Sequence, residues 1–95
     1  YRNPAKGFES FFVRFDGVVA LELMRRTDIR DSDEGEHTGF CHVAFGVGSR
    51  EAVCSLTERL RRDGYRIAGE PRQTGDGYFE SVVCDPDGNR IEIVA

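Results

Sequence analysis

The chain has 95 residues, 39% of them hydrophobic, which predicts one small globular domain rather than a disordered segment. A formal net charge of −4 argues against nucleic acid as a partner. No apolar run approaches the roughly 20 residues needed to cross a bilayer, so no membrane partner is expected. The three cysteines are widely spaced and form no CxxC pair, which predicts a reduced, cytoplasmic setting with buried thiols.

The first part of the chain predicts a β-hairpin. Residues 8–15 are rich in aromatic residues, and Asp16-Gly17 is a preferred dipeptide for a two-residue hairpin turn. Residues 18–24 then run back as a strand in which Glu22 points away from its aliphatic neighbours. The charged, glycine-punctuated residues 25–38 predict a linker.

The second part predicts one helix among four strands. The helix is expected over 49–63, with Ser49 as its N-cap and Gly64 as its C-terminal glycine. The strands are expected over 40–47, near 65–70, and over 78–84 and 90–95. Asp85-Pro86-Asp87-Gly88 predicts a tight turn, which accounts for both aspartates without a catalytic role.

The two parts contain similar segments in the same order. Phe8-Glu9-Ser10 returns as Phe79-Glu80-Ser81 and Asp16-Gly17 as Asp87-Gly88, both at an offset of 71, while Leu21-Glu22-Leu23 returns as Ile91-Glu92-Ile93 at an offset of 70. We therefore expect an α+β fold of paired βαβββ units, with residues 1–24 as the closing strands of the first and 39–95 as a complete second.

The first copy lacks its opening strand and helix. Because the sequence begins with Tyr1 rather than Met, we expect residues to be missing from the start. The alternative is a natural half-length variant that completes itself by pairing.

Three polar side chains in the expected strands could carry chemistry. Glu22, His42 and Glu92 each stand in mid-strand between apolar neighbours that point the other way. An unpaired carboxylate on such a face costs several kcal/mol if it is buried. A divalent metal would relieve that cost, because imidazole nitrogen and carboxylate oxygen suit zinc, nickel, iron, cobalt or manganese. The alternative for each residue taken alone is a solvent-facing glutamate or a structural histidine.

These features together resemble the vicinal oxygen chelate superfamily, which includes glyoxalase I, bleomycin-resistance proteins and extradiol dioxygenases. The resemblance rests on the repeated unit, on Gly39-Phe40-Cys41-His42-Val43-Ala44-Phe45, and above all on Asp85-Pro86-Asp87-Gly88-Asn89-Arg90-Ile91-Glu92-Ile93. It implies a cupped sheet formed by two units, with metal ligands on the first and last strands of each.

Carried onto this chain, the resemblance implies metal ligands at Glu22, His42 and Glu92, with no position for a fourth. A glutamate at position 22 fits the four-ligand glyoxalase I pattern, which implies a metal-dependent lyase or isomerase, with Glu92 as the proton-transferring base and lactoylglutathione lyase as the specific guess. The resemblance also implies a small-molecule substrate with adjacent oxygens and a homodimer. A metal-free antibiotic-binding protein, or a dioxygenase of the same superfamily, is the alternative function.

Overall fold

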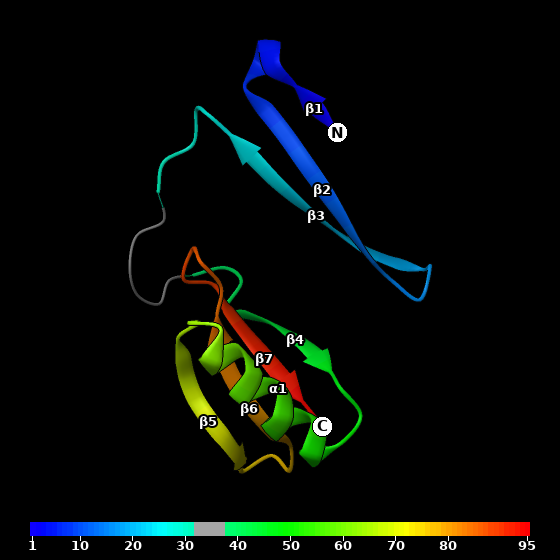
Figure 1. The fold of residues 1–95 in the computed structure, drawn as a ribbon, viewed down its shortest axis with the longest axis vertical. Helices are drawn as coiled ribbons and strands as arrows, with labels where there is room; N and C mark the ends of the chain where they lie inside the picture. The colour runs from blue at the N-terminus through cyan, green and yellow to red at the C-terminus, as the bar shows by residue number, and fades with distance from the viewer. Residues whose placement is uncertain (32–37) are drawn as a thin grey trace. The chain divides into compact units, whose positions relative to one another are not determined.

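A computed structural model of the chain describes residues 1–31 and 38–95 (Figure 1). It divides into two compact units, Tyr1–Ser32 and Asp33–Ala95. The first unit contains strands only, apart from one short 3-10 turn, and the second combines a sheet with a helix. The α+β class predicted from the sequence is therefore confirmed.

The first unit is an antiparallel three-stranded sheet in the order β1-β2-β3. Its elements are β1 (Arg2–Asn3), η1 (Pro4–Lys6), β2 (Phe8–Phe15) and β3 (Val19–Arg26). β3 extends through Arg25 and Arg26, where the linker over 25–38 was expected to begin, because the ladder continues there and pairs Arg25 with Glu9 and Arg26 with Phe8. Arg25 also forms an ion pair of 3.2 Å with Glu9. Residues 32–37 of that linker lie outside the described part of the chain.

The turn between β2 and β3 differs in length from the prediction. Asp16 and Gly17 both take positive φ angles, 46° and 75°, and the Val18 amide donates to the Phe15 carbonyl at 3.3 Å. The turn conformation is thus the one that Asp-Gly favours. The register pairs Phe15 with Val19, however, so three residues connect the strands instead of two.

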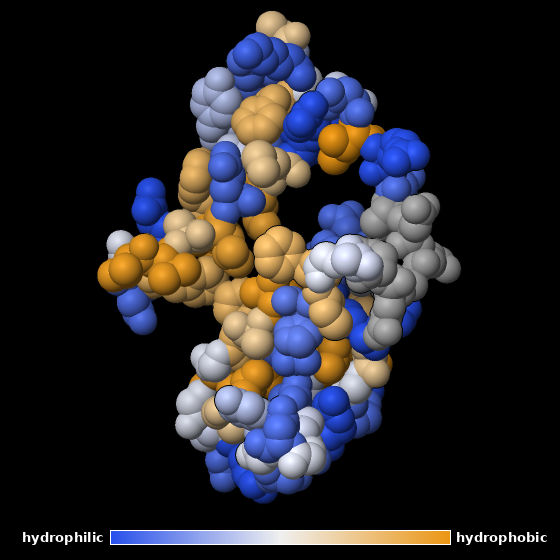
Figure 2. All heavy atoms as spheres, turned by 180° about the vertical axis from the view of Figure 1, so that it is seen from behind, coloured by the Kyte–Doolittle hydropathy of each residue, from blue (hydrophilic) through white to orange (hydrophobic). Residues whose placement is uncertain are grey.

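Apolar side chains of the hairpin remain on the surface of the first unit. Phe11 is 68% exposed and Leu23 56%, and these two residues are cross-strand partners. Such side chains form part of the hydrophobic surface in Figure 2. The predicted alternation holds, since Phe11, Val13 and Leu21 share one side of the hairpin while Glu22 lies on the other.

The second unit is a four-stranded sheet covered on one face by a helix (Figure 1). The strand order is β4-β7-β6-β5, and β7 runs parallel to β4 and antiparallel to β6. The elements are β4 (His42–Gly46), α1 (Arg50–Arg62), β5 (Ile67–Gln73), β6 (Phe79–Cys84) and β7 (Arg90–Val94). Val53 of α1 packs with Val83 and Ile93 to form the core.

The helix begins and ends where its capping residues predict. The Ser49 hydroxyl accepts a hydrogen bond of 3.1 Å from the Ala52 amide, which satisfies one of the free N–H groups of the first turn. Gly64 follows the helix with a φ of 91°, a conformation that glycine adopts without a steric penalty. These two ends fix where the chain leaves β4 and where it enters β5.

β5 lies later in the sequence than expected. It spans Ile67–Gln73 rather than residues near 65–70, and it includes Pro71. Proline has no N–H group for the strand ladder, and it is tolerated here because β5 is an edge strand with an irregular register between Gly69 and Arg72. The irregularity places Arg72 opposite Glu80.

The internal repeat is present in the structure, but with a single offset of 70. Phe12 pairs with Glu22 in the β2–β3 ladder, and Val82 pairs with Glu92 in the β6–β7 ladder. Each member of the second pair lies 70 residues after the corresponding member of the first. The two registers are those expected if Glu22 and Glu92 are equivalent positions. With that equivalence the counterpart of Glu80 is Ser10, and the offset of 71 between the two Phe-Glu-Ser segments would exchange the two faces of the sheet.

The cysteines only partly match the expectation of buried thiols. Cys84 is buried, whereas Cys41 and Cys54 are exposed, and all three are free. No helix formed by residues 1–31 and 38–95 is long and apolar enough to span a membrane.

Candidate functional site

The second unit has one face that α1 does not cover, and the candidate residues lie on it. In the β4–β7 ladder Ala44 pairs with Glu92, so that His42, two residues before Ala44, shares the face of Glu92. In the β6–β7 ladder Val82 pairs with Glu92, which places Glu80 on the same face. Alternation along β6 turns Ser81 and Val83 toward the helix instead. The sheet therefore presents three titratable side chains from three adjacent strands.

His42 and Glu92 are in direct contact. The imidazole Nε2 lies 3.2 Å from Glu92 Oε2, and the two side chains are 39% and 21% exposed. Both groups thus remain accessible from the uncovered face. The sequence prediction that these two residues converge is supported by this geometry.

Glu22 lies on β3 of the first unit, opposite Phe12, and its side chain is exposed. The convergence of Glu22 with His42 and Glu92 on one metal site therefore stays a prediction. Within residues 1–31 and 38–95, no three histidine, cysteine, aspartate or glutamate side chains lie close enough to hold a metal ion together.

Glu80 is the residue of this face that sequence reasoning missed. It is only 7% exposed, and its Oε2 atom is buried with no hydrogen-bond partner. Burial raises the pKa of Glu80 above its usual value, and the charge of Glu92 and a hydrogen bond between the two carboxyl groups raise it further. Asp76 adds to this rise, while the positive charge of Arg72 opposes it. Glu80 therefore retains its proton to a higher pH than an ordinary glutamate.

The donor chemistry of this face fits a divalent cation. His42 offers a nitrogen and Glu92 an oxygen at close range, and the unpartnered buried oxygen of Glu80 lies on the adjacent strand. These are the ligand types that zinc, nickel, iron, cobalt and manganese share. Among the described residues of the second unit, His42 and Glu92 are a pair in direct contact that could hold such an ion.

A small cavity of about 350 Å³ opens beside this pair. Small or apolar residues form part of its wall, namely Ala68, Gly69 and Val82. The remaining wall is polar and includes Arg72 and Arg90 together with His42 and Glu92. A second hollow, on the first unit, contains none of the candidate residues.

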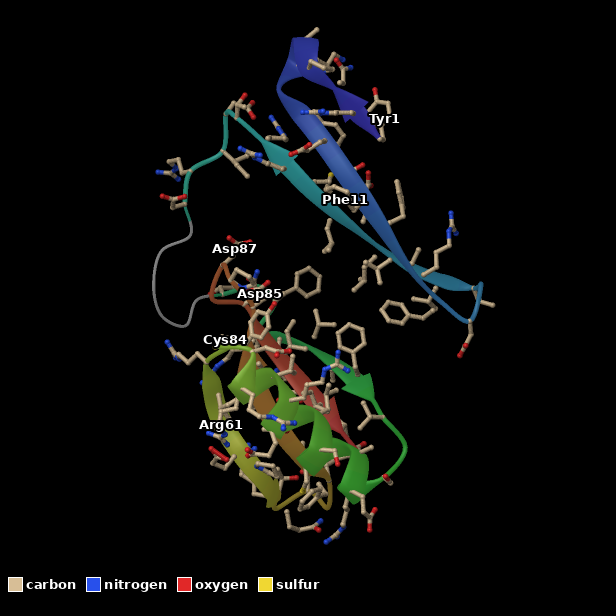
Figure 3. All side chains as sticks on the ribbon, viewed as in Figure 1. Tyr1, Phe11, Arg61, Cys84, Asp85 and Asp87 are labelled. Atoms are coloured by element: carbon tan, nitrogen blue, oxygen red, sulfur yellow. The ribbon has the colours of Figure 1, made fainter. Side chains whose placement is uncertain are left out.

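Asp85 and Asp87 do not belong to the site. Both lie in the turn between β6 and β7, where Figure 3 shows them. Asp85 Oδ1 accepts hydrogen bonds from the amides of Asp87 and Asn89, at 3.0 and 2.7 Å, and its Oδ2 accepts one of 2.8 Å from the Asn89 side chain. The carboxylate is used to hold the turn, as the sequence predicts. This turn fixes the register that brings Val82 opposite Glu92.

Comparison with known families supports the resemblance seen in the sequence. The family described as Glyoxalase/Bleomycin resistance protein/Dioxygenase superfamily matches residues 2–93. The chain belongs to this superfamily. A curated relative, the uncharacterized protein YqjT of Bacillus subtilis (strain 168), is 37% identical over 60 residues, which cover 60% of this chain and 47% of YqjT.

Solved structures of the superfamily resemble the chain as well. Glyoxalase I from Zea mays superposes with a TM-score of 0.79 at 27% identity, over 98% of this chain and 33% of the maize chain. A glyoxalase family protein from Enterococcus faecalis superposes with a TM-score of 0.75 at 22% identity, over 100% of this chain and 73% of its own, and this likeness concerns the fold alone. The chain thus spans about a third of the maize enzyme and about half of YqjT.

Proposed function

We propose that this chain supports a metal-dependent lyase or isomerase reaction of the glyoxalase I type, on a small substrate with two adjacent oxygens. The observation that carries the proposal is the contact of His42 Nε2 with Glu92 Oε2, 3.2 Å apart on the uncovered face of the sheet. The superfamily membership supports it. Lactoylglutathione lyase is the specific activity to test first.

In this proposal His42 and Glu92 hold a divalent cation, with Glu22 as a further ligand. When bound, such a cation acts as a Lewis acid on the substrate oxygens. Glu92 takes a proton from one carbon of the substrate and returns a proton to the neighbouring carbon, as a general base and then a general acid. Its partial exposure of 21% allows a substrate to reach the carboxylate from the uncovered face.

Turnover of the hemithioacetal of a 2-oxoaldehyde tests the proposal. With saturating divalent metal, we expect the Glu92→Gln variant to lose about 100- to 10,000-fold in kcat, the range typical for a general base. Gln has nearly the shape of Glu, so the circular dichroism spectrum should not change. Glu58→Gln on α1 is the matched control and should retain activity.

The opposite pattern would support a metal-free binding protein. In that case the wild-type chain would turn over no such substrate, and an apolar antibiotic would bind equally well to wild type and Glu92→Gln.

We also propose that the chain forms a homodimer. β4 and β5 are the edge strands of the sheet in the second unit, and unpaired strand edges favour association. Symmetric pairing of identical surfaces is the commonest way for two copies to cover such edges. Sedimentation equilibrium at micromolar concentration should report twice the mass of 10.7 kDa, and a stable monomer would contradict this proposal.

A further inference from the structure

The first unit contains a hollow of about 710 Å³ that the proposed reaction does not use. Its wall combines apolar and charged side chains, namely Phe8, Met24, Ile29, Lys6, Arg26 and Asp28. All six belong to Tyr1–Ser32, so the hollow is formed within one unit. Its volume lies in the range typical of small-molecule sites. The hollow thus has the size of a ligand site.

Backbone contacts fix the turn that carries Lys6. Lys6 is the last residue of η1, and Gly7 follows it with a φ of 56° and an amide that donates to the Pro4 carbonyl at 3.1 Å. The Thr27 amide donates to the Gly7 carbonyl at 3.1 Å and so ties this turn to the end of β3. A Cβ atom built at Gly7 would collide with the Thr27 hydroxyl. Glycine at position 7 therefore allows η1 to lie against β3 and places Lys6 at the edge of the hollow.

The two long strands supply an apolar surface beside Lys6. The β2–β3 ladder pairs Phe8 with Arg26, and Met24, two residues earlier on β3, shares their face. Met24 and Ile29 are each 59% exposed, so their side chains are available to a ligand. Glu22 lies on the same face as Met24 but does not line the hollow. An apolar group that covered these side chains would remove hydrophobic surface from water, which favours binding.

The hollow carries one net positive charge, that of Lys6. Arg26 and Asp28 neutralise each other, because Arg26 Nε and Nη2 donate to the two Asp28 carboxylate oxygens at 2.9 and 2.6 Å. The Lys6 ammonium forms no ion pair or side-chain hydrogen bond within residues 1–31 and 38–95. Its three N–H donors are therefore open to a ligand.

We propose that this hollow binds a small carboxylic acid with a hydrocarbon chain, whose carboxylate pairs with Lys6 while the hydrocarbon lies over Phe8, Met24 and Ile29. Hydrogen bonds between an ammonium and a carboxylate are charge-assisted and stronger than neutral ones. A carboxylate matches the single net charge, whereas a phosphate monoester brings about −1.5 to −2 at pH 7. The inference goes beyond the proposed function, because none of these residues lines the cavity beside His42 and Glu92.

The test is an NMR titration of the metal-free full chain at constant ionic strength. Lys6 is the only lysine in the sequence, so labelling with ¹³C-lysine gives a single side-chain Cε signal that reports on this site. Three probes are compared: hexanoate, the neutral hexanamide, which keeps the hydrocarbon chain, and acetate, which keeps the charge. We expect hexanoate to shift the Lys6 signal together with amides of η1 and β3.

The order of affinities decides between the two halves of the proposed site. Hexanoate should bind at least ~10-fold more tightly than hexanamide, since hydrogen bonds to charged groups are the stronger ones. It should also bind at least ~10-fold more tightly than acetate, because each methylene group removed from water adds to the affinity. Equal affinity for hexanoate and either of the other probes would overturn the inference, as would largest amide shifts in the second unit.

Variants assign the two contacts to named side chains. Lys6→Gln, followed through the amides, should weaken hexanoate binding about 10-fold and leave hexanamide binding unchanged. Met24→Gln should weaken hexanoate binding and leave acetate binding unchanged. Arg14→Gln on β2 removes the same charge as Lys6→Gln outside the hollow, and it is the matched control.

Two outcomes of the variant series would overturn the inference. The first is undiminished hexanoate affinity in Lys6→Gln. The second is a loss of equal size in Arg14→Gln, because it would show a general attraction between charges rather than binding at Lys6. The dispersion of the same spectra shows that each variant is folded.

Discussion

A buried pair of hydroxyl groups joins α1 to the sheet, and its removal gives a sharp test of how the site-bearing strand is held. Thr57 and Ser81 are both 0% exposed, and their oxygens lie 2.7 Å apart. The Thr57 hydroxyl donates to the Val53 carbonyl at 2.6 Å, so the Ser81 hydroxyl must donate to Thr57. Ser81 is adjacent to Glu80 on β6, and this bond therefore helps to fix the strand that carries the buried carboxyl.

Thr57→Val keeps the shape of the side chain but removes the acceptor of Ser81. The Ser81 hydroxyl is then buried without a partner, which costs about 1–3 kcal/mol of the free energy of unfolding. The double variant Thr57→Val/Ser81→Ala removes both groups and should be closer to wild type than the single Thr57→Val variant.

Native-state amide hydrogen exchange, followed at amides of α1 and β6, measures this free energy for the second unit. A Thr57→Val variant within 0.5 kcal/mol of wild type, a threshold of the size reached by neutral surface changes, would refute the reasoning. A double variant less stable than Thr57→Val would refute it as well.

Two further predictions follow from the cap and from the buried carboxyl. Ser49→Ala removes the acceptor for the Ala52 amide and should lower the free energy of unfolding by about 0.5–2 kcal/mol, as measured by urea denaturation. Ser49→Asp keeps an acceptor and should not lower it. Equal losses of unfolding free energy in the two variants would contradict the capping role. The folded-state pKa of Glu80 is raised, so its contribution to stability is complete at low pH and is lost as the pH rises through that pKa. Glu80→Gln should remove this loss, so that the variant gains stability relative to wild type as the pH rises above the ordinary pKa of a glutamate; parallel pH profiles would contradict it.

Much of the second unit could be predicted from the sequence because its signals are local. Ser49 and Gly64 mark the ends of the helix through chemistry that needs no distant partner. The contact between His42 and Glu92 could also be predicted, because the resemblance to a known family supplies the pairing of strands far apart in the chain.

Glu80 could not be identified in the same way. Its burial depends on the register of β6 against β7 and on the bulged β5, which bring together residues far apart in the sequence. Glu80 lies two residues before Val82 on β6, so the two side chains share a face, and Val82 pairs with Glu92. This spacing was the signal that could have placed Glu80 beside Glu92. Arg72 was missed because the strand was expected near residues 65–70, whereas β5 continues to Gln73.

The proposed cation site is tested most directly by Mn²⁺ binding to the metal-free chain, measured from the electron paramagnetic resonance signal of the free ion. Mn²⁺ prefers oxygen and nitrogen donors, so the exposed thiols of Cys41 and Cys54 interfere little. We predict that His42→Ala and Glu92→Gln each weaken binding by at least ~10-fold, that Glu22→Gln weakens it as well, and that Glu58→Gln leaves it unchanged. Unaltered Mn²⁺ affinity in both His42→Ala and Glu92→Gln would contradict the proposal that these two residues hold the metal.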